Sequence, residues 1–391
     1  MTVTIGVASD LHCQPGTHSP RSSYLLSDGA RVPANSSPVQ ALFHLIANEN
    51  LRSDILALPG DFSDRANHHG FVVGIFNARE IGLKLHAGDI IASLGNHDVD
   101  SHHDFSLDHL YLGRRLFSDF PCEEKALLDS FYGSGFTIID KPNWQCLIVN
   151  SVTHHRDVAS AERGLLTPEQ LEAIETAVRE LKPNPIRFCL VHHHPLPHEE
   201  MGLGASDLME GGEQLLQILE TNQFGLVIHG HKHHPRLRYS TSGTAAIPVF
   251  ASGSLSAIIP DRLSRSVRNT FHSIQIKTAD SVVANLHGTI RTWELSTDKG
   301  WVPSTLQSAG FPHHAGFGCR TPNADLVVRI KQALGTDSWV EWDDLLQAIP
   351  ELQFLSPIEL RQVGQLLEPE EIFIKPRAEE PLLIGKTSKA R

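Results

Sequence analysis

The stretch Gly95-Asn96-His97-Asp98 sets three polar side chains of different chemistry directly after an apolar run, Ile90–Leu94. Such a run is typical of a buried strand, and glycine allows the backbone to turn sharply at its end. Asn offers a neutral oxygen, His a nitrogen that can carry a proton, and Asp a carboxylate that can orient the imidazole. The same stretch also fits an ordinary turn, so a chemical role for it depends on which other polar residues lie nearby.

Four other predicted strands also end in Asp or His. The residues at their ends are Asp10 with His12, Asp61, His192, and His231 with His233. In an open parallel sheet the carboxyl ends of the strands gather along one edge, where ligands bind. Side chains two apart in an extended segment point to the same side, as Asp-x-His and His-x-His spacings require. We therefore expect these side chains to converge in space.

Carboxylates, imidazoles and one carboxamide together make the donor set of a two-metal site. Two divalent cations about 3.5–4 Å apart need a bridging ligand and separate terminal ligands. Asp61 suits the bridge, and Asn96 offers a weak neutral oxygen. Mixed nitrogen and oxygen donors favour Mn, Fe, Zn or Co over Ca or Mg. Two carboxylates and a bridging hydroxide leave about one positive charge, which suits a monoanionic phosphodiester.

The composition narrows the class of protein. The chain has 391 residues, and its formal charge of -12 argues against a broad nucleic-acid or anionic-membrane surface. Its 24 histidines, many in doublets or triplets, favour metal binding. The five cysteines lack zinc-finger spacing, and no signal peptide or membrane-length apolar run is present. We therefore predict a cytoplasmic protein without a membrane span.

Strands and helices alternate along the first part of the chain. The strands are predicted near residues 3–8, 54–58, 90–94, 187–191 and 225–228, and the helices near 38–46, 70–81, 168–181 and 212–220. Strands then follow with few helices between them, at 236–239, 245–251, 270–277 and 283–295. This order predicts two packed sheets with helices on the outer faces.

The C-terminal part has a different pattern. Helices are predicted at residues 325–334, 342–349 and 357–367, and the end from 378 is predicted to be frayed. We therefore divide the chain into a catalytic domain, residues 1–300, and a small helical extension, residues 301–391. The extension is a candidate for capping the site, for oligomerisation or for binding a protein partner, and the pattern does not choose among these.

The five motifs resemble those of the calcineurin-like metallophosphoesterases. The motifs, which follow the family's order over about residues 1–295, are Asp10-Leu11-His12, Gly60-Asp61-x-x-Asp64, Gly95-Asn96-His97-Asp98, the His192 triplet and Gly230-His231-Lys232-His233. The resemblance implies an α/β fold, a four-layer αββα sandwich of two mixed sheets flanked by helices. It also implies a hydrolase with two divalent transition-metal ions.

The resemblance assigns roles to residues. It implies that one metal is held by Asp10, His12, Asp61 and His233, and the other by Asp61, Asn96, His192 and His231. It implies that His97 contacts the substrate phosphate and aids departure of the leaving group, with Asp98 orienting it. Asp64 is expected to cap or support the loop rather than to bind metal. Any of His192, His193 and His194 could ligate, and the first matches the pattern best.

Three segments resemble the class III cyclic-nucleotide phosphodiesterase branch of the family: Gly164-Leu165-Leu166-Thr167, the run from His192 to Pro197, and Gly212-Glu213-Gln214-Leu215-Leu216. They favour hydrolysis of small phosphodiesters, with cyclic nucleotides as candidate substrates. A DNA or RNA nuclease is the alternative, although the acidity and the lack of a basic stretch with interleaved aromatics weigh against it. A non-catalytic scaffold of the same fold would be expected to lack ligands, and none is missing.

Overall fold

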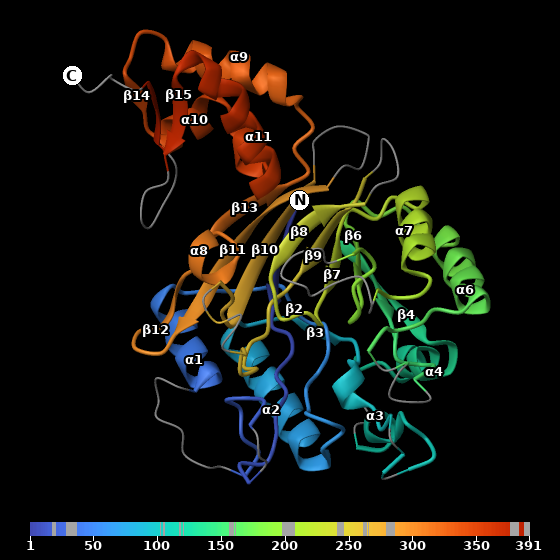
Figure 1. The fold of residues 1–391 in the computed structure, drawn as a ribbon. Coiled ribbons are helices and arrows are strands. Elements are labelled where there is room, and N and C mark those ends of the chain that lie inside the picture. Colours follow the sequence, from blue (N-terminus) through green and yellow to red (C-terminus); the bar gives the residue numbers. More distant parts are fainter. Residues whose placement is uncertain are drawn as a thin grey trace.

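Two β-sheets lie face to face between layers of helices, and a smaller C-terminal lobe is attached at one end (Figure 1). The computed structural model describes residues 1–17, 21–28, 37–101, 103–104, 106–116, 119, 121–155, 160, 162–197, 208–240, 246–260, 264, 266–278, 286–375 and 383–386. Among these residues no helix has both the length and the hydrophobicity that a membrane span requires.

The first sheet has the order β12-β11-β10-β1-β2-β3, with β13 paired to β11. Its strands are β1 (Thr2–Val7), β2 (Ile55–Leu58), β3 (Asp89–Ala92), β10 (Thr270–Thr278), β11 (Leu286–Ser296), β12 (Gly300–Pro303) and β13 (His314–Phe317). The strands β1, β2 and β3 are parallel, whereas β10 and β11 are antiparallel to their neighbours. The sheet is therefore mixed, as expected.

The second sheet has the order β4-β5-β6-β7-β9-β8. Its strands are β4 (Phe136–Lys141), β5 (Trp144–Val149), β6 (Arg187–Leu190), β7 (Val227–His229), β8 (Arg236–Tyr239) and β9 (Pro248–Ala251). The strands from β5 to β9 along the sheet run parallel, and β4 and β8 are antiparallel edges. The predicted four-layer α/β sandwich with two mixed sheets is confirmed.

Helices cover the outer faces of both sheets because their apolar stripes match the sheet surfaces. The helices α1 (Pro38–Asn48) and α2 (His68–Lys84) pack on the first sheet, and α6 (Pro168–Arg179) and α7 (Gly212–Thr221) on the second (Figure 1). The short helices α3 (Tyr111–Leu116) and α4 (Lys125–Ser134) lie between them in the chain. The predicted start of α6 is confirmed, since the Thr167 side chain accepts a hydrogen bond from the Gln170 amide.

The C-terminal lobe runs helix, strand, helix, helix, strand, strand around its own apolar core. These elements are α9 (Asn323–Leu334), β14 (Trp339–Val340), α10 (Trp342–Ala348), α11 (Pro357–Leu367), β15 (Ile372–Lys375) and β16 (Leu383–Lys386). The expectation of a frayed end was wrong for β16, because this strand pairs with both β15 and β14. The rest of that predicted tail lies outside the described residues.

The lobe contacts the end of the first sheet at which β1 begins, near the N-terminus (Figure 1). The Gly316 amide donates to the Leu355 carbonyl at 2.9 Å, and the His287 ring lies 4.1 Å from that of Phe354. Lys277 of β10 pairs with His287 on one side and with Thr2, the first residue of β1, on the other. His287 therefore lies at the end of the sheet where β1 begins. Since the candidate site lies where β1 ends, the residues of the lobe that the structure describes do not cap it. Strands β12 and β13 continue the first sheet past residue 300, and the division proposed at that residue stays a prediction.

Candidate dinuclear metal centre

The loops that follow β1, β2, β3, β6 and β7 meet at one edge shared by the two sheets. The structure brings together all seven side chains that the sequence proposed as metal ligands, namely Asp10, His12, Asp61, Asn96, His192, His231 and His233. The strands β1 to β3 belong to one sheet and β6 and β7 to the other. The site therefore depends on how the two sheets pack against each other.

Four donor atoms define the first position. The Nε2 atoms of His12 and His233 lie 2.9 Å apart, and Oδ1 of Asp10 lies 3.3 Å from Nε2 of His233. Oδ2 of Asp61 lies 3.5 Å from Nε2 of His12. Two donors at about 2.1 Å from one ion, at angles of roughly 90–110°, are about 3.0–3.4 Å apart. The side chains present therefore fit one transition-metal ion.

A second group of donors lies on the other side of Asp61. Oδ1 of Asn96 is 3.1 Å from Nε2 of His192 and 3.1 Å from Nδ1 of His231. The Nδ1 of His192 faces the Pro59 carbonyl at 3.1 Å and must donate to it. This contact fixes the tautomer of His192 and leaves the lone pair of Nε2 for a metal.

Asp61 lies between the two groups. Its Oδ2 is 3.5 Å from Nε2 of His12 and also 3.5 Å from Nε2 of His192. Its other oxygen, Oδ1, accepts a hydrogen bond of 2.8 Å from the His97 amide, which holds the carboxylate in place. One oxygen is thus anchored to the protein while the other faces both positions, as a bridging ligand requires.

The ligand loops are held in a conformation that side-chain-bearing residues rarely adopt. Five of the proposed ligands have positive φ: Asp10 (53°), His12 (48°), Asp61 (57°), His231 (77°) and His233 (55°). A residue in this region costs about 1–2 kcal/mol. Backbone bonds between loops oppose that cost, since the Asp10 amide donates to the Gly60 carbonyl and the His12 amide to the Asp61 carbonyl. The fold therefore organises the donors through its own hydrogen bonds.

Gly95 packs closely against the Asp61 carboxylate. A Cβ at this position would lie 2.0 Å from Oδ1 of Asp61. Any side chain would displace the carboxylate or the loop that holds it. The glycine that opens the motif therefore makes room for the Asp61 carboxylate.

His97 projects toward the same site with its ring about one-third exposed. Its Nδ1 donates to Oδ1 of Asp64 at 3.0 Å, and its ring lies 4.6 Å from that of His12. With Nδ1 engaged, Nε2 is the atom available to a substrate. Asp64 thus holds the proposed catalytic group in place. With His12 and His97 it also forms a group that could hold a metal ion, so its expected non-ligand role stays a prediction.

Asp98 does not orient His97 as the sequence suggested. Its Oδ2 accepts hydrogen bonds from the amides of Asp61 (2.8 Å) and Gly95 (3.0 Å), and Oδ1 accepts from the Ser63 amide (2.9 Å). Residues 96–98 form a 3₁₀ turn, in which successive side chains diverge by about 120°. The side chain of Asp98 therefore points inward, and its hydrogen bonds join the loop after β2 to the loop after β3.

The electrostatics of the site favour a bound cation. Burial, together with the charges of Asp10 and Asp98, raises the pKa of Asp61 well above its usual value. Burial also raises the pKa of Asp98 to about 6. Burial lowers the pKa of His12 and that of His231, the latter to about 4, so both rings are neutral at pH 7 and can act as ligands. Divalent ions would compensate the clustered carboxylates.

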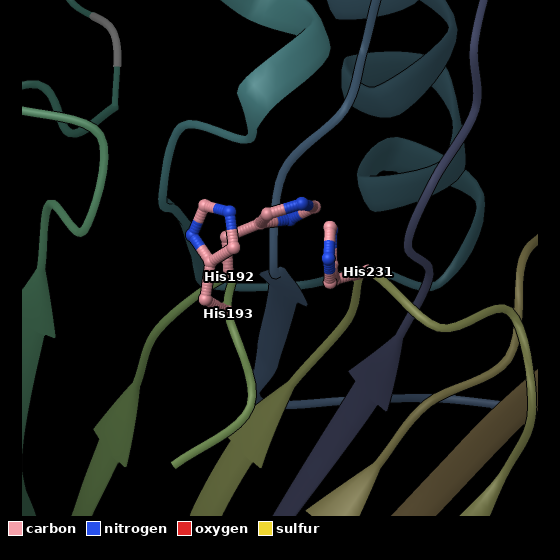
Figure 2. Close-up of side chains that lie close together, drawn as sticks. All are labelled: His192, His193 and His231. Carbon is pink, nitrogen blue, oxygen red and sulfur yellow. The ribbon is translucent and has the colours of Figure 1, made fainter. Parts of the chain in front are cut away.

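The sequence offered His193 only as an alternative to His192 and gave no sign of the buried Ser151 beside it. Figure 2 shows His192, His193 and His231, whose rings lie around a common space. Nδ1 of His193 lies 2.8 Å from Oγ of Ser151, and the buried His155 ring lies 5.3 Å from that of His193. The histidine triplet was the only sequence signal for this arrangement, since Ser151 follows β5 without a recognisable motif.

Comparisons with known proteins identify the family of this chain. The sequence model for "Calcineurin-like phosphoesterase" matches residues 3–235, and since this is more than half of the chain, the protein belongs to that family. The buried groups of His and Asp side chains that could hold a metal fit this family. A second model, "wHTH-Calcineurin_assc", matches residues 315–369. The name denotes a winged helix-turn-helix, and the order from α9 to β16 has that form. None of the curated proteins compared with the chain matches it.

Several solved structures are similar to the chain at low identity. A purple acid phosphatase from yellow lupin (Lupinus luteus) is 12% identical, with a TM-score of 0.48, and the match covers 77% of this chain and 52% of that one. This chain thus spans about half the length of the lupin enzyme. A predicted phosphoesterase from Streptococcus pneumoniae is 9% identical over 81% and 98% of the two chains, with a TM-score of 0.32. Phosphopantetheinyl hydrolase from Mycobacterium tuberculosis is 14% identical over 66% and 97%, with a TM-score of 0.38.

Proposed function

We propose that the protein is a phosphodiesterase that hydrolyses small phosphodiesters, with cyclic nucleotides as candidate substrates. The observation that carries the proposal is the position of Asp61, whose Oδ2 lies 3.5 Å from donor nitrogens of both groups. The residues in this proposal are Asp10, His12, Asp61 and His233 for one ion and Asp61, Asn96, His192 and His231 for the other. We propose Mn, Fe, Zn or Co as the ions, because the donors are mixed nitrogen and oxygen.

Divalent ions bound there supply a water of lowered pKa and polarise the phosphoryl oxygens. The chain's own contribution to bond cleavage is His97. Its Nδ1–H donates to Asp64, so donation from Nε2 to the leaving oxygen requires the imidazolium form of His97, in which a second proton sits on Nε2. General acid help of this kind contributes about 10²–10⁴-fold to the rate.

The choice of a small diester rests on the segments that resemble the class III branch. Although far apart in the sequence, they pack together beside the second metal position. A Cβ on Gly164 would lie 2.6 Å from Cγ of His193, and a Cβ on Gly212 would lie 2.9 Å from Cα of Pro195, so the first and third segments both pack against the second. The three segments thus form one local structure, which supports treating them as a single branch feature.

A nuclease is the second candidate, and the winged helix-turn-helix is the observation that favours it. Winged helices can bind nucleic acid, and binding of this kind relies on Lys and Arg at the phosphates. Residues 319–371 contain ten acidic and four basic residues, and α11 carries one of each. This charge balance supports a protein partner or self-association for the lobe over a nucleic-acid contact.

We also propose that the protein works in the cytoplasm. The support is that all five cysteines are free thiols, four of them buried, which fits a reducing compartment.

The proposed function is tested by an activity panel on protein reconstituted separately with Mn, Zn, Co and Fe. The substrates are bis-p-nitrophenyl phosphate, p-nitrophenyl phosphate, cyclic nucleotides and single- and double-stranded DNA. We expect turnover of the small diesters, with the monoester a poorer substrate. Cleavage of DNA without turnover of small diesters would favour the nuclease, and activity on the monoester alone would contradict the phosphodiesterase assignment.

A further inference from the structure

We propose that His193 is an additional ligand at the second metal position, so that three imidazoles converge on one ion. This inference rests on the proposed dinuclear centre and makes His193 a ligand in addition to His192, whereas the sequence offered it only as an alternative to His192. His193 follows His192 directly after β6, and donor atoms of His192, His193 and His231 lie within 4.8 Å of one another. In Figure 2 one nitrogen of the His193 ring faces the other two rings.

The spacing of the rings fits a shared ion. Their centroids are 4.9 Å (His192 to His193), 5.2 Å (His192 to His231) and 4.6 Å (His193 to His231) apart. Three imidazoles bound at about 2.1 Å to one ion would have centroids roughly 4.6–5.3 Å apart. Aromatic packing alone allows similar distances, so the direction of the nitrogens and the support of the ring carry the rest of the argument.

The His193 ring is held in a fixed orientation. Oγ of Ser151 lies 2.8 Å from Nδ1 of His193, which fixes the ring with its Nε2 edge on the side of the other two histidines. A Cβ on Gly164 would lie 2.6 Å from Cγ of His193, and the φ of this glycine is +69°. The ring is therefore clamped between a hydroxyl and a bare backbone. A hydrogen bond to the other ring nitrogen is the usual way in which proteins orient a metal-binding histidine.

The consequence is a difference between the two metal positions. The first has two nitrogen and two oxygen donors, from His12, His233, Asp10 and Asp61. The second gains a third imidazole beside its Asp61 and Asn96 oxygens. Additional imidazole donors favour Zn, Co or Fe over Mn and Mg. We therefore expect the second position to select the more nitrogen-preferring ion from a mixture.

The test uses the full-length protein without substrate. Zinc binding is followed by calorimetry for the wild type, His193→Phe, Ser151→Ala and a control, His272→Phe, which removes a buried histidine elsewhere in the sheets. We expect the wild type and the control to bind two equivalents of zinc. In His193→Phe the affinity for one of these equivalents should fall by more than about 10–100-fold, the range typical of losing a residue that only hydrogen-bonds to a ligand. Ser151→Ala should weaken the same equivalent within that range. Wild-type affinity for both equivalents in His193→Phe would show that the ring only packs.

A zinc-loaded crystal structure of the wild type decides the matter if His193→Phe fails to fold. The proposal requires Nε2 of His193 at about 2.1 Å from one zinc ion. A separation above about 3 Å from both ions would overturn it. Because neither readout uses turnover, an inactive protein with this zinc geometry would refute the proposed function and leave the ligand assignment standing.

Discussion

The Asp64 carboxylate lies 3.0 Å from Nδ1 of His97 and 4.0 Å from Nδ1 of His12. It thus touches the proposed general acid and approaches a proposed metal ligand at the same time. Asp64 is buried, and the hydrogen bond from His97 lowers its pKa although burial alone would raise it. An ionised Asp64 therefore fixes the His97 ring so that Nε2 is presented to the substrate.

Replacing His97 with alanine should remove the proton donor and leave the metal donors in place. We expect turnover of bis-p-nitrophenyl phosphate to fall by about 10²–10⁴-fold, with metal content unchanged by elemental analysis. Unchanged turnover in the folded variant would exclude His97 as the donor.

Replacing Asp64 with alanine should release the His97 ring without removing it. We expect a decrease in kcat of about tenfold or more, smaller than that for His97→Ala, because the imidazole stays near the site. Asp119→Ala is the matched control, since this carboxylate forms an exposed ion pair with Arg79 at 2.7 Å. Equal kcat values for the Asp64 variant and the wild type would mean that the contact has no positioning role.

Replacing Asp98 with alanine should destabilise the protein more than it alters proton transfer. Three buried amides, those of Asp61, Ser63 and Gly95, would lose their acceptor. Each orphaned buried donor costs about 1–3 kcal/mol, so we expect the free energy of unfolding in urea to fall by about 3–9 kcal/mol. Asp98→Asn keeps one acceptor oxygen and should lose less. A stable Asp98→Ala variant with a selective loss of kcat would instead support the orienting role.

His272 should make the protein sensitive to acid. Burial lowers its pKa from 6.5 to about 3, and Nδ1 lies 2.8 Å from Oγ1 of Thr292. Between these pH values the unfolded chain binds a proton that the folded chain does not, so stability falls as pH falls through this window, by up to about 1.4 kcal/mol per unit.

The variant His272→Gln should flatten the dependence of the unfolding free energy on pH between 6.5 and 4 relative to the wild type. The exposed His44 provides the control, and His44→Gln should keep the wild-type slope. An unchanged slope in His272→Gln would show that this ring is not the source of acid sensitivity.

The donors could be predicted because each follows an apolar run that fills a buried strand. β2 and β6, for example, are buried at every position and end just before Asp61 and His192. Parallel pairing then gathers their ends at one edge. The long helices were predictable for a related reason, because each carries an apolar stripe with helical spacing.

The sequence pattern does not predict contacts between loops. Asp98 adjoins His97 in the chain, yet the tight turn sends their side chains apart and brings Asp64 to the imidazole instead. Ser151 and Gly164 support His193 from two loops without any periodic signal. The strands β14 and β16 of the lobe, with two and four residues, are too short for periodicity to reveal.

The central claim is that Asp61 bridges two ions, and electron paramagnetic resonance of protein loaded with two equivalents of Mn²⁺ tests it most directly. Ions sharing a carboxylate about 3.5–4 Å apart are exchange-coupled. We predict the spectrum of a coupled pair in the wild type and its loss in Asp61→Ala. Two bound but uncoupled Mn²⁺ ions in the wild type, or an unchanged coupled pair in Asp61→Ala, would contradict the account.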